Sequence, residues 1–153
     1  MTFDEVSKVS FMCWPNDLDT NLHMNNGRYL TLLDLVRADL MIRTGLFKKL
    51  IKYKWMPVLV SAKIEFRKSI HLWEKFDIQT QLIGYDEKRF YIEQFIYNKK
   101  KELIFKAVVK AAFVKKKKSV SVKEIFETLG EDKVFKKLPE HIQLWQASEK
   151  MDR

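Results

Sequence analysis

The sequence predicts an α+β domain in which one long helix lies against a curved antiparallel sheet. Apolar residues recur at helical spacing over residues 27–44, and four later segments alternate apolar and polar side chains with short turns between them. The chain has 153 residues, only four glycines and three prolines, and no low-complexity linker at which a second domain would begin. We therefore expect one domain over residues 1–153, with a core over about 4–117 and a helical tail over about 119–150.

A strand and the long helix come first in the chain. The strand is expected within residues 4–14, where apolar residues are frequent and Pro15 ends the segment. The helix is indicated by an apolar series at helical spacing: Leu30, Leu33, Val36, Leu40 and Met41. Asn25 or Asn26 can cap its first turn, and Gly45 suits its exit because glycine readily adopts the left-handed backbone of a helix end.

Four strands are expected after the helix. In the first of them, residues 58–67, one face carries only apolar side chains: Val60, Ala62, Ile64 and Phe66. The other three strands cover residues 75–85, 89–98 and 103–115, and short polar turns of the kind found in hairpins join them. This succession predicts an antiparallel meander.

The tail predicts two more helices, and the order of all the elements predicts the layers. Ser121 and Gly130 frame the first tail helix, and Pro139 stands near the start of the second. Since one amphipathic helix buries its apolar stripe best when a twisted sheet curls around it, we expect one helix layer and one sheet layer. Long edge strands would remain open, and pairing with a second copy would cover one of them. We expect a homodimer and leave further assembly into a homotetramer open.

Charge and composition restrict the partners and the compartment. Lys and Arg number 29 against 20 Asp and Glu, and the resulting charge of +9 is concentrated in residues 48–54, 98–102 and 114–118. These clusters would attract a polyanion, although lysines at strand ends are often just solvated tips. No run approaches the roughly 20 apolar residues of a membrane span, the first residues lack the basic flank of a signal peptide, and Cys13 has no disulfide partner. We expect a cytoplasmic protein without a membrane span.

Residues 17–30, DLDTNLHMNNGRYL, concentrate polar side chains directly before the long helix. A carboxylate and an imidazole in such a loop lie beside the free N–H groups and the positive dipole of a helix N-terminus. This combination can polarise a carbonyl oxygen and position a water or a nucleophilic carboxylate, as acyl-transfer hydrolysis requires. The alternative from spacing alone is that the aspartates and asparagines cap the helix and satisfy loop amides.

The segment resembles the active-site motif of hot-dog-fold acyl thioesterases, Asp-x-Asn-x-His-x-Asn-Asn-x-x-Tyr, of the 4-hydroxybenzoyl-CoA thioesterase type and of the plant acyl-carrier-protein thioesterases. Residues 66–94 look like the strands that follow the motif in this family, so the likeness covers roughly residues 4–117. The resemblance implies the hot-dog fold, in which a curved antiparallel sheet wraps a long central helix. It also implies hydrolysis of an acyl thioester to a free acid and a thiol.

The resemblance further implies roles for individual residues. Asp19 matches the family's catalytic carboxylate, acting as nucleophile or as general base, and Asn21 and His23 match polar residues that orient or activate the attacking group. An oxyanion and substrate-binding role at the helix entry falls to four residues: Asn25, Asn26, Gly27 and Arg28. Other family members carry the carboxylate on the central helix, where Asp34 is the candidate. The alternative role of Asp34 is an ion pair with Arg37.

The resemblance implies an acyl-CoA substrate, in which coenzyme A is part of the substrate, and a place in lipid metabolism. It implies no metal, no further cofactor and no nucleic-acid partner. An acyl carrier protein is the alternative carrier. The acyl chain needs an apolar tunnel, for which the candidates are Met24, Leu32, Trp55, Met56, Val58 and Val60. Two other functions stay open: a hydratase or dehydratase of acyl thioesters, which the motif disfavours, and a non-catalytic module that binds acyl-CoA or an anionic surface.

Overall fold

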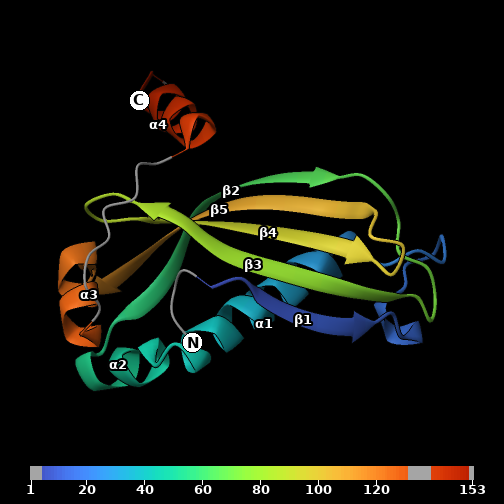
Figure 1. Cartoon of the computed structure of the whole chain (residues 1–153), viewed down its shortest axis with the longest axis horizontal. Coiled ribbons are helices and arrows are strands. Elements are labelled where there is room, and N and C mark those ends of the chain that lie inside the picture. Colours follow the sequence, from blue (N-terminus) through green and yellow to red (C-terminus); the bar gives the residue numbers. More distant parts are fainter. Residues whose placement is uncertain (1–4, 131–138, 152–153) are drawn as a thin grey trace.

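The computed structural model describes residues 5–130 and 139–151 and shows a curled antiparallel sheet with one long helix in its hollow (Figure 1). The helices are α1 (Asn26–Arg43), α2 (Leu46–Tyr53), α3 (Val122–Leu129) and α4 (Glu140–Met151), with a short 3-10 helix, η1, at Pro15–Asp17. The strands are β1 (Ser7–Met12), β2 (Met56–Phe66), β3 (Lys75–Tyr85), β4 (Phe90–Asn98), β5 (Leu103–Lys115) and β6 (Lys118–Ser119). The predicted α+β class, with a helix layer against a sheet layer, is confirmed.

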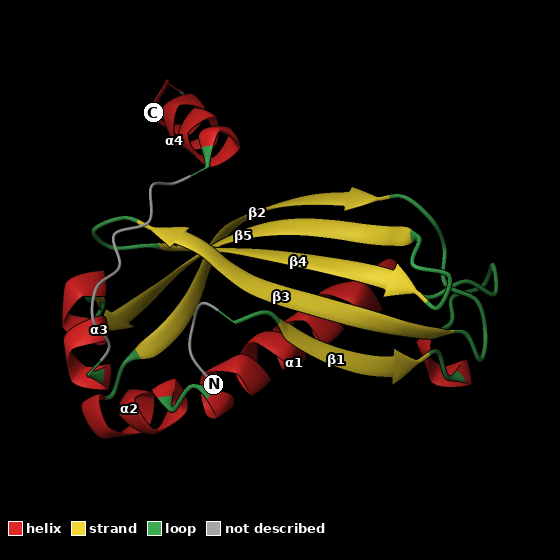
Figure 2. Cartoon of the chain, viewed as in Figure 1, coloured by secondary structure: helices red, strands yellow, loops and turns green. Residues whose placement is uncertain are grey.

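All these strands belong to one antiparallel sheet (Figure 2). The order is β1-β3-β4-β5-β2, and β6 pairs with the end of β5. The consecutive strands β3, β4 and β5 form the predicted meander in the middle of the sheet. β2 precedes them in the chain but pairs with β5, so β1 and β2 are the two edges.

α1 begins and ends close to its predicted limits. Its N-cap is Asn25, whose Oδ1 accepts a hydrogen bond from the N–H of Gly27 at 2.8 Å. Its buried face consists of Tyr29, Leu32, Leu33, Val36 and Leu40. Leu30, the first residue of the apolar series, lies outside this face and is 43 % exposed. The buried stripe is centred on Tyr29 and Leu33, which are four residues apart and lie on one face of the helix. Leu30 follows Tyr29 directly and therefore points away from this face.

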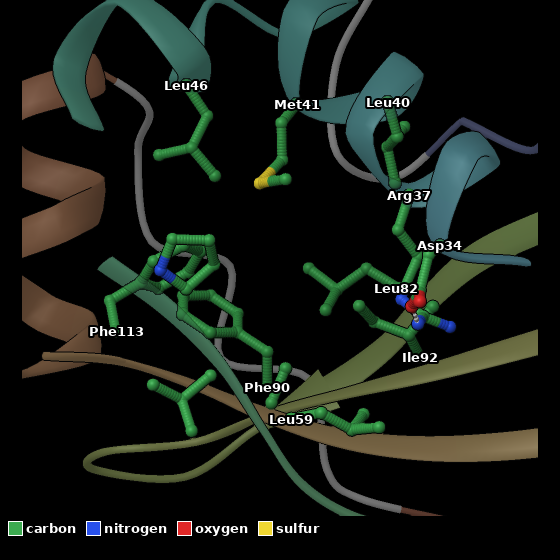
Figure 3. A pocket seen from close by; sticks show the side chains of 13 residues that line it. Asp34, Arg37, Leu40, Met41, Leu46, Leu59, Leu82, Phe90, Ile92 and Phe113 are labelled. Atoms are coloured by element: carbon green, nitrogen blue, oxygen red, sulfur yellow. Dashed lines mark hydrogen bonds and ion pairs between the residues drawn. The ribbon is translucent and has the colours of Figure 1, made fainter. Parts of the chain in front are cut away.

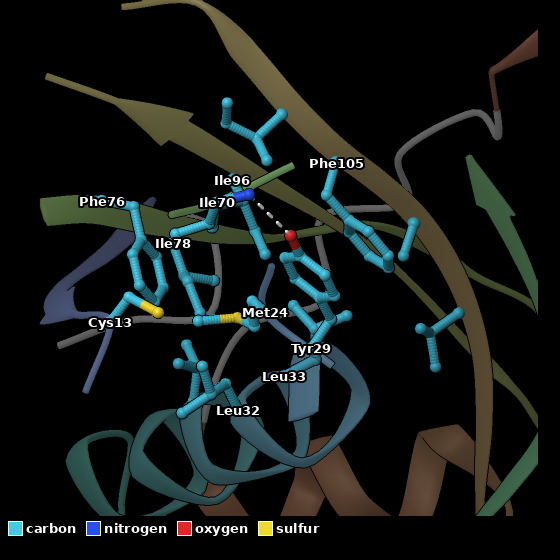
Figure 4. Close-up of a cluster of buried hydrophobic side chains, with 14 residues drawn as sticks. Cys13, Met24, Tyr29, Leu32, Leu33, Ile70, Phe76, Ile78, Ile96 and Phe105 are labelled. Atoms are coloured by element: carbon cyan, nitrogen blue, oxygen red, sulfur yellow. Dashed lines mark hydrogen bonds between the residues drawn. The ribbon is translucent and has the colours of Figure 1, made fainter. Parts of the chain in front are cut away.

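Two apolar clusters fill the hollow of the sheet, one near each end of α1. Figure 4 shows the first cluster, with Tyr29 inside it. The Tyr29 ring stacks on Phe105 with ring centroids 5.4 Å apart, and its hydroxyl oxygen accepts the N–H of Ile70 at 3.2 Å. The second cluster joins α2 and α3 to β3, β4 and β5. The long helix is therefore anchored over its whole length by side chains distant in sequence.

α2 is a helix that the sequence patterns do not predict. Its lysines make residues 48–54 look like a charged surface segment, whereas Leu46 and Leu50, four residues apart, are buried in the second cluster. A helix of eight residues with two buried positions carries too little periodicity to be recognised, and it is too short to be stable alone. Packing against α1 and α3 stabilises it.

Both tail helices form as predicted. The side-chain oxygen of Ser121 accepts the N–H of Glu124 at 3.2 Å at the start of α3, and Gly130 closes this helix with φ +69°. α4 contacts the sheet on the side away from α1, where Trp145 packs against Tyr91 of β4. The hollow that holds α1 stays clear of α4.

Candidate active site

The motif DLDTNLHMNNGRYL forms the turn that leads from η1 into α1. The turn closes through backbone hydrogen bonds: the N–H of Asp19 donates to the carbonyl oxygen of His23 at 2.8 Å, and the N–H of Leu22 donates to that of Asp19 at 3.1 Å. Leu22 has φ +61°, in the left-handed region. The N–H of Met24 donates to the carbonyl oxygen of Ile70 at 2.9 Å, which ties the turn to the segment before β3.

Asp19 lies half-buried in this turn, with one carboxylate oxygen engaged. Its Oδ1 accepts hydrogen bonds from the backbone N–H groups of Asn21 at 2.9 Å and His23 at 3.3 Å. Its Oδ2 receives no hydrogen bond from the part of the chain that the structure describes. The carboxylate therefore has a defined orientation, and one oxygen remains for a water or a substrate.

Asp17, two residues earlier, joins the loop to the helix. It is only 6 % exposed, its Oδ1 accepts the Nε–H of Arg28 at 2.7 Å, and its Oδ2 accepts the N–H of Trp14 at 2.8 Å. The guanidinium of Arg28 is thus held by Asp17. This pair fixes the loop against the first turn of α1 and with it the position of Asp19.

The N–H of Asn26 is an available backbone donor at the N-terminus of α1. The N–H of Gly27 donates to Oδ1 of Asn25 at 2.8 Å, and the N–H of Arg28 donates to the carbonyl oxygen of Asn25 at 2.9 Å. Within the described ranges, the N–H of Asn26 has no acceptor. Of the helix-entry amides expected near a thioester oxygen, that of Asn26 is available, and the helix dipole adds to its positive partial charge.

Asn21 and His23 lie on the same turn as Asp19, and the structure brings a second imidazole beside them. Asn21 is exposed. The His23 ring packs edge-on against His71 with ring centroids 4.9 Å apart, and the two residues form a β-bridge. His71 lies between β2 and β3, and no sequence pattern marks it as a neighbour of the motif. Pairing between distant segments creates this contact.

An apolar cavity of about 360 Å³ lies between the C-terminal half of α1 and the sheet (Figure 3). Its walls carry side chains from α1, α2 and four strands, among them Leu40, Met41, Leu46, Leu59, Leu82 and Phe113. Of the six residues predicted to line an acyl tunnel, Val58 lines this cavity, whereas Met24 and Leu32 belong to the first apolar cluster. The prediction that an apolar tunnel lies between the helix and the sheet agrees with the structure, whereas most of the lining residues that were predicted for it do not line this cavity.

The ion pair considered for Asp34 and Arg37 is present at one side of the cavity. The side chain of Asp34 is 68 % exposed, whereas that of Arg37 is 15 % exposed. Arg37 Nη1 donates to Oε1 of Gln94 at 2.6 Å, and Nε2 of Gln94 donates to Oγ1 of Thr80 at 3.1 Å. Burial lowers the pKa of the Arg37 guanidinium, and these partners offset part of the cost of burying its charge. Asp34 therefore stabilises a largely buried cation.

Two further findings concern residues 5–130 and 139–151. No helix in these ranges is long and apolar enough to cross a membrane. They also contain no group of three histidine, cysteine, aspartate or glutamate side chains placed to share a metal ion.

Among the relatives that resemble this chain in sequence are two proteins named THEM6. Protein THEM6 of Xenopus laevis is 42 % identical over 80 residues, which are 52 % of this chain and 39 % of that protein. Protein THEM6 of Drosophila melanogaster is 29 % identical over 144 residues, which are 92 % of this chain and 72 % of that protein. The chain thus spans only part of the length of these relatives, and well under half of the Xenopus protein.

The fold and the family follow from two further comparisons. The solved structure of a DHNA-CoA thioesterase from Staphylococcus aureus matches with a TM-score of 0.73 at 18 % identity, over 97 % of this chain and 95 % of that chain, which is a likeness of fold. Residues 13–146 match the thioesterase-like superfamily, and this range holds the whole motif and every strand except β1. The chain belongs to the thioesterase-like superfamily and has the predicted hot-dog fold.

Proposed function

We propose that the protein hydrolyses an acyl-CoA thioester to a free acid and coenzyme A, with Asp19 as general base or nucleophile. The observation that carries this proposal is the setting of Asp19, a carboxylate with one oxygen held by two loop amides, on the turn that ends at the N-terminus of α1. Membership of the thioesterase-like superfamily supports the reaction, and the fold likeness to a DHNA-CoA thioesterase supports coenzyme A as the thiol part.

The proposed chemistry is attack on the thioester carbonyl carbon. As a general base, Asp19 takes a proton from the water that forms the new C–O bond; as a nucleophile, it forms an anhydride that water then cleaves. The N–H of Asn26 and the dipole of α1 stabilise the negative charge that develops on the carbonyl oxygen. The carbon–sulfur bond breaks, and the thiolate leaves and takes up a proton.

The acyl group is assigned to the apolar cavity, and a second copy of the chain is proposed to close it. β2 is an edge strand with a row of exposed apolar side chains: Met56, Val58, Leu59, Val60, Ile64 and Phe66. Val58 and Leu59 also line the cavity. Pairing of β2 with its counterpart would cover this apolar edge and wall off the cavity. A Val58→Glu/Val60→Glu variant should then sediment as a monomer and lose activity, and a monomeric wild-type protein would contradict this assembly.

Asp34 is the second candidate for the working carboxylate because it lines the apolar cavity. Its ion pair with the buried Arg37 favours a structural role. Asp34 follows Asn26 by eight residues, or about 12 Å along a helix with a rise of 1.5 Å per residue. Within one protomer, a thioester bound at the N–H of Asn26 is therefore out of reach of Asp34.

Thiol release from acyl-CoA thioesters, short to long and aromatic, tests the proposal with Asp19→Asn and Asp34→Asn as a matched pair. Asparagine at position 19 still accepts the two loop hydrogen bonds, so only the charge and basicity are lost. We expect Asp19→Asn to lower kcat/KM at least about a hundredfold and Asp34→Asn less than about tenfold. The reverse order would assign the chemistry to Asp34.

The same assay, extended to acyl-carrier-protein thioesters and to direct binding of acyl-CoA, separates two of the remaining functions. If the protein hydrolyses acyl-carrier-protein thioesters but no acyl-CoA, the carrier of the acyl group is an acyl carrier protein and not coenzyme A. Tight binding of acyl-CoA by the intact protein without release of thiol would instead support a non-catalytic module.

A further inference from the structure

A second hollow is an open groove of about 690 Å³. The loops that bound it lie at the end of the sheet on the right in Figure 1. The groove is bounded by the segment between β2 and β3, by the β4–β5 turn and by His23 of the motif loop. Its lining includes six charged side chains: Lys68, Glu74, Lys75, Lys99, Lys100 and Glu102. We call this hollow the basic groove.

The four lysines of the basic groove are not equivalent. Lys68 forms an ion pair with Glu102, and the Nζ of Lys99 lies 3.3 Å from a carboxylate oxygen of Asp77 on β3. Neither Lys75 nor Lys100 forms an ion pair with a residue that the structure describes. Lys100 is near enough to Glu102 to help lower the pKa of that carboxyl, and with Lys75 it presents positive charge to an anionic ligand.

Trp73 adds an exposed aromatic ring to the same groove. It is 53 % exposed and has φ +64°, a backbone conformation that bulky side chains rarely adopt. Its N–H donates to the carbonyl oxygen of Cys13 at 2.8 Å, and its ring meets Trp14 edge-on with centroids 5.4 Å apart. The structure thus keeps an indole exposed in the same groove as the lysines, on a backbone in the left-handed region, instead of burying it in the core.

We propose that the basic groove binds the adenosine phosphate end of coenzyme A, an inference that rests on the proposed hydrolysis of acyl-CoA. Lysine ammonium groups bind phosphate as point charges, which suits Lys75 and Lys100, and a purine stacks on an exposed aromatic face such as that of Trp73. His23 borders both the groove and the turn of Asp19, so the pantetheine arm leads from the groove to the motif. A carrier protein's phosphopantetheine has no base to stack on Trp73.

Calorimetric titration with adenosine 3′,5′-bisphosphate tests the groove directly. Lys75→Glu/Lys100→Glu should weaken binding at least about tenfold. Lys48→Glu/Lys123→Glu, on α2 and α3 at the other end of the molecule, makes the same change in net charge and should stay within about twofold. At physiological ionic strength the Debye length is about 8 Å, so distant lysines contribute little. Equal weakening in both variants, or no binding by the wild-type protein, would overturn the proposal.

Trp73→Asn tests the stacking contact separately from the charges. Asparagine tolerates the left-handed backbone of this position, so the fold is retained while the ring is lost. We expect binding of the bisphosphate to weaken at least about fivefold while binding of inorganic pyrophosphate stays unchanged. An equal effect on both probes would contradict a role for Trp73 in holding the base.

Hydrolysis assays separate this proposal from the proposed function. The lysine variant should lose at least about ten times more kcat/KM on acyl-CoA than on the matching acyl-N-acetylcysteamine thioester, which has no phosphate or base. If the wild-type protein hydrolyses no thioester but the lysine variant still loses bisphosphate binding, the thioesterase proposal fails and the groove assignment holds. Equal losses on both substrates, or a loss confined to acyl-carrier-protein thioesters, would refute the groove assignment.

Discussion

The apolar cavity and the basic groove lie in one small domain, yet they depend on its folding in different ways. Leu46, Leu82 and Phe113 line the cavity and also belong to the second apolar cluster, so the same side chains shape the cavity and hold the fold together. The groove is lined mainly by exposed polar residues that ion pairs and backbone hydrogen bonds position.

This difference separates two kinds of change. A substitution that reshapes the cavity also alters core packing, so acyl preference and stability are coupled there. A substitution of a lysine in the groove removes a charge that contributes little to the core. The nucleotide end of a substrate can therefore be altered by mutation more freely than the acyl end.

The largest expected effect is the difference in the free energy of unfolding between a variant in the apolar cavity and a variant in the basic groove. Phe113→Ala removes a ring that is 6 % exposed, and we expect it to lower the free energy of unfolding by about 3–5 kcal/mol. Lys75→Ala, at an exposed position of the groove, should change it by no more than about 0.5 kcal/mol. Urea denaturation measures both. If the two variants differed by less than about 1 kcal/mol, the cavity wall would not be part of the stabilising core.

A smaller effect is expected at Tyr29, which supports the segment beside the motif loop. Tyr29→Phe keeps the ring on Phe105 but leaves the buried N–H of Ile70 without its acceptor, which should cost about 1–3 kcal/mol. Tyr97→Phe is the matched control, because no hydrogen bond of the Tyr97 hydroxyl occurs among the described residues. Equal melting temperatures for the two variants would show that the Tyr29 hydroxyl contributes nothing.

The next effect concerns chain length and rests on the proposed function. Ala111→Leu adds bulk to the cavity wall, and one methylene in an apolar pocket is worth about 1–3 kcal/mol of discrimination. We expect kcat/KM for the longest accepted acyl-CoA to fall about tenfold relative to the shortest. The panel of acyl-CoA thioesters measures this ratio. A uniform loss at every length would place the acyl chain outside this cavity.

The smallest effect is expected at Asp77, the ion-pair partner of Lys99 in the basic groove, and it is a stability effect that depends on pH. The hydrogen bond from Ser10 at 2.5 Å, with Lys99 and Lys8 nearby, lowers the pKa of Asp77. A carboxyl whose pKa is lower in the folded state stabilises the fold above its unfolded pKa of about 3.9, and this contribution disappears as the pH falls through the folded pKa.

Asp77→Asn should therefore cost about 1 kcal/mol at neutral pH, and the cost should shrink as the pH falls below about 4. Denaturation curves of both proteins from neutral to acidic pH measure it. A cost that stayed constant over this range would mean that the charge of Asp77 does not stabilise the fold.

Much of the fold follows from short-range patterns in the chain. The spacing of Leu33, Val36 and Leu40, with Asn25 as cap, predicts α1 almost to its limits because a helix is built from contacts three and four residues apart. Alternation and polar turns predict the meander of β3, β4 and β5 for a similar reason. The resemblance of residues 17–30 added the hot-dog fold and the candidate Asp19, and the fold is confirmed.

The tertiary structure alone decided which distant residues share a site. His23 meets His71, and lysines from two separate segments line the basic groove, because pairing of strands and bridges brings these segments together. Asp34 borders the apolar cavity because α1 packs against the sheet. The sequence by itself determined the helix, the meander and the polar loop, since each depends on neighbours along the chain. Cavities and charge clusters depend on register, curl and packing across the whole sheet, which no local pattern encodes.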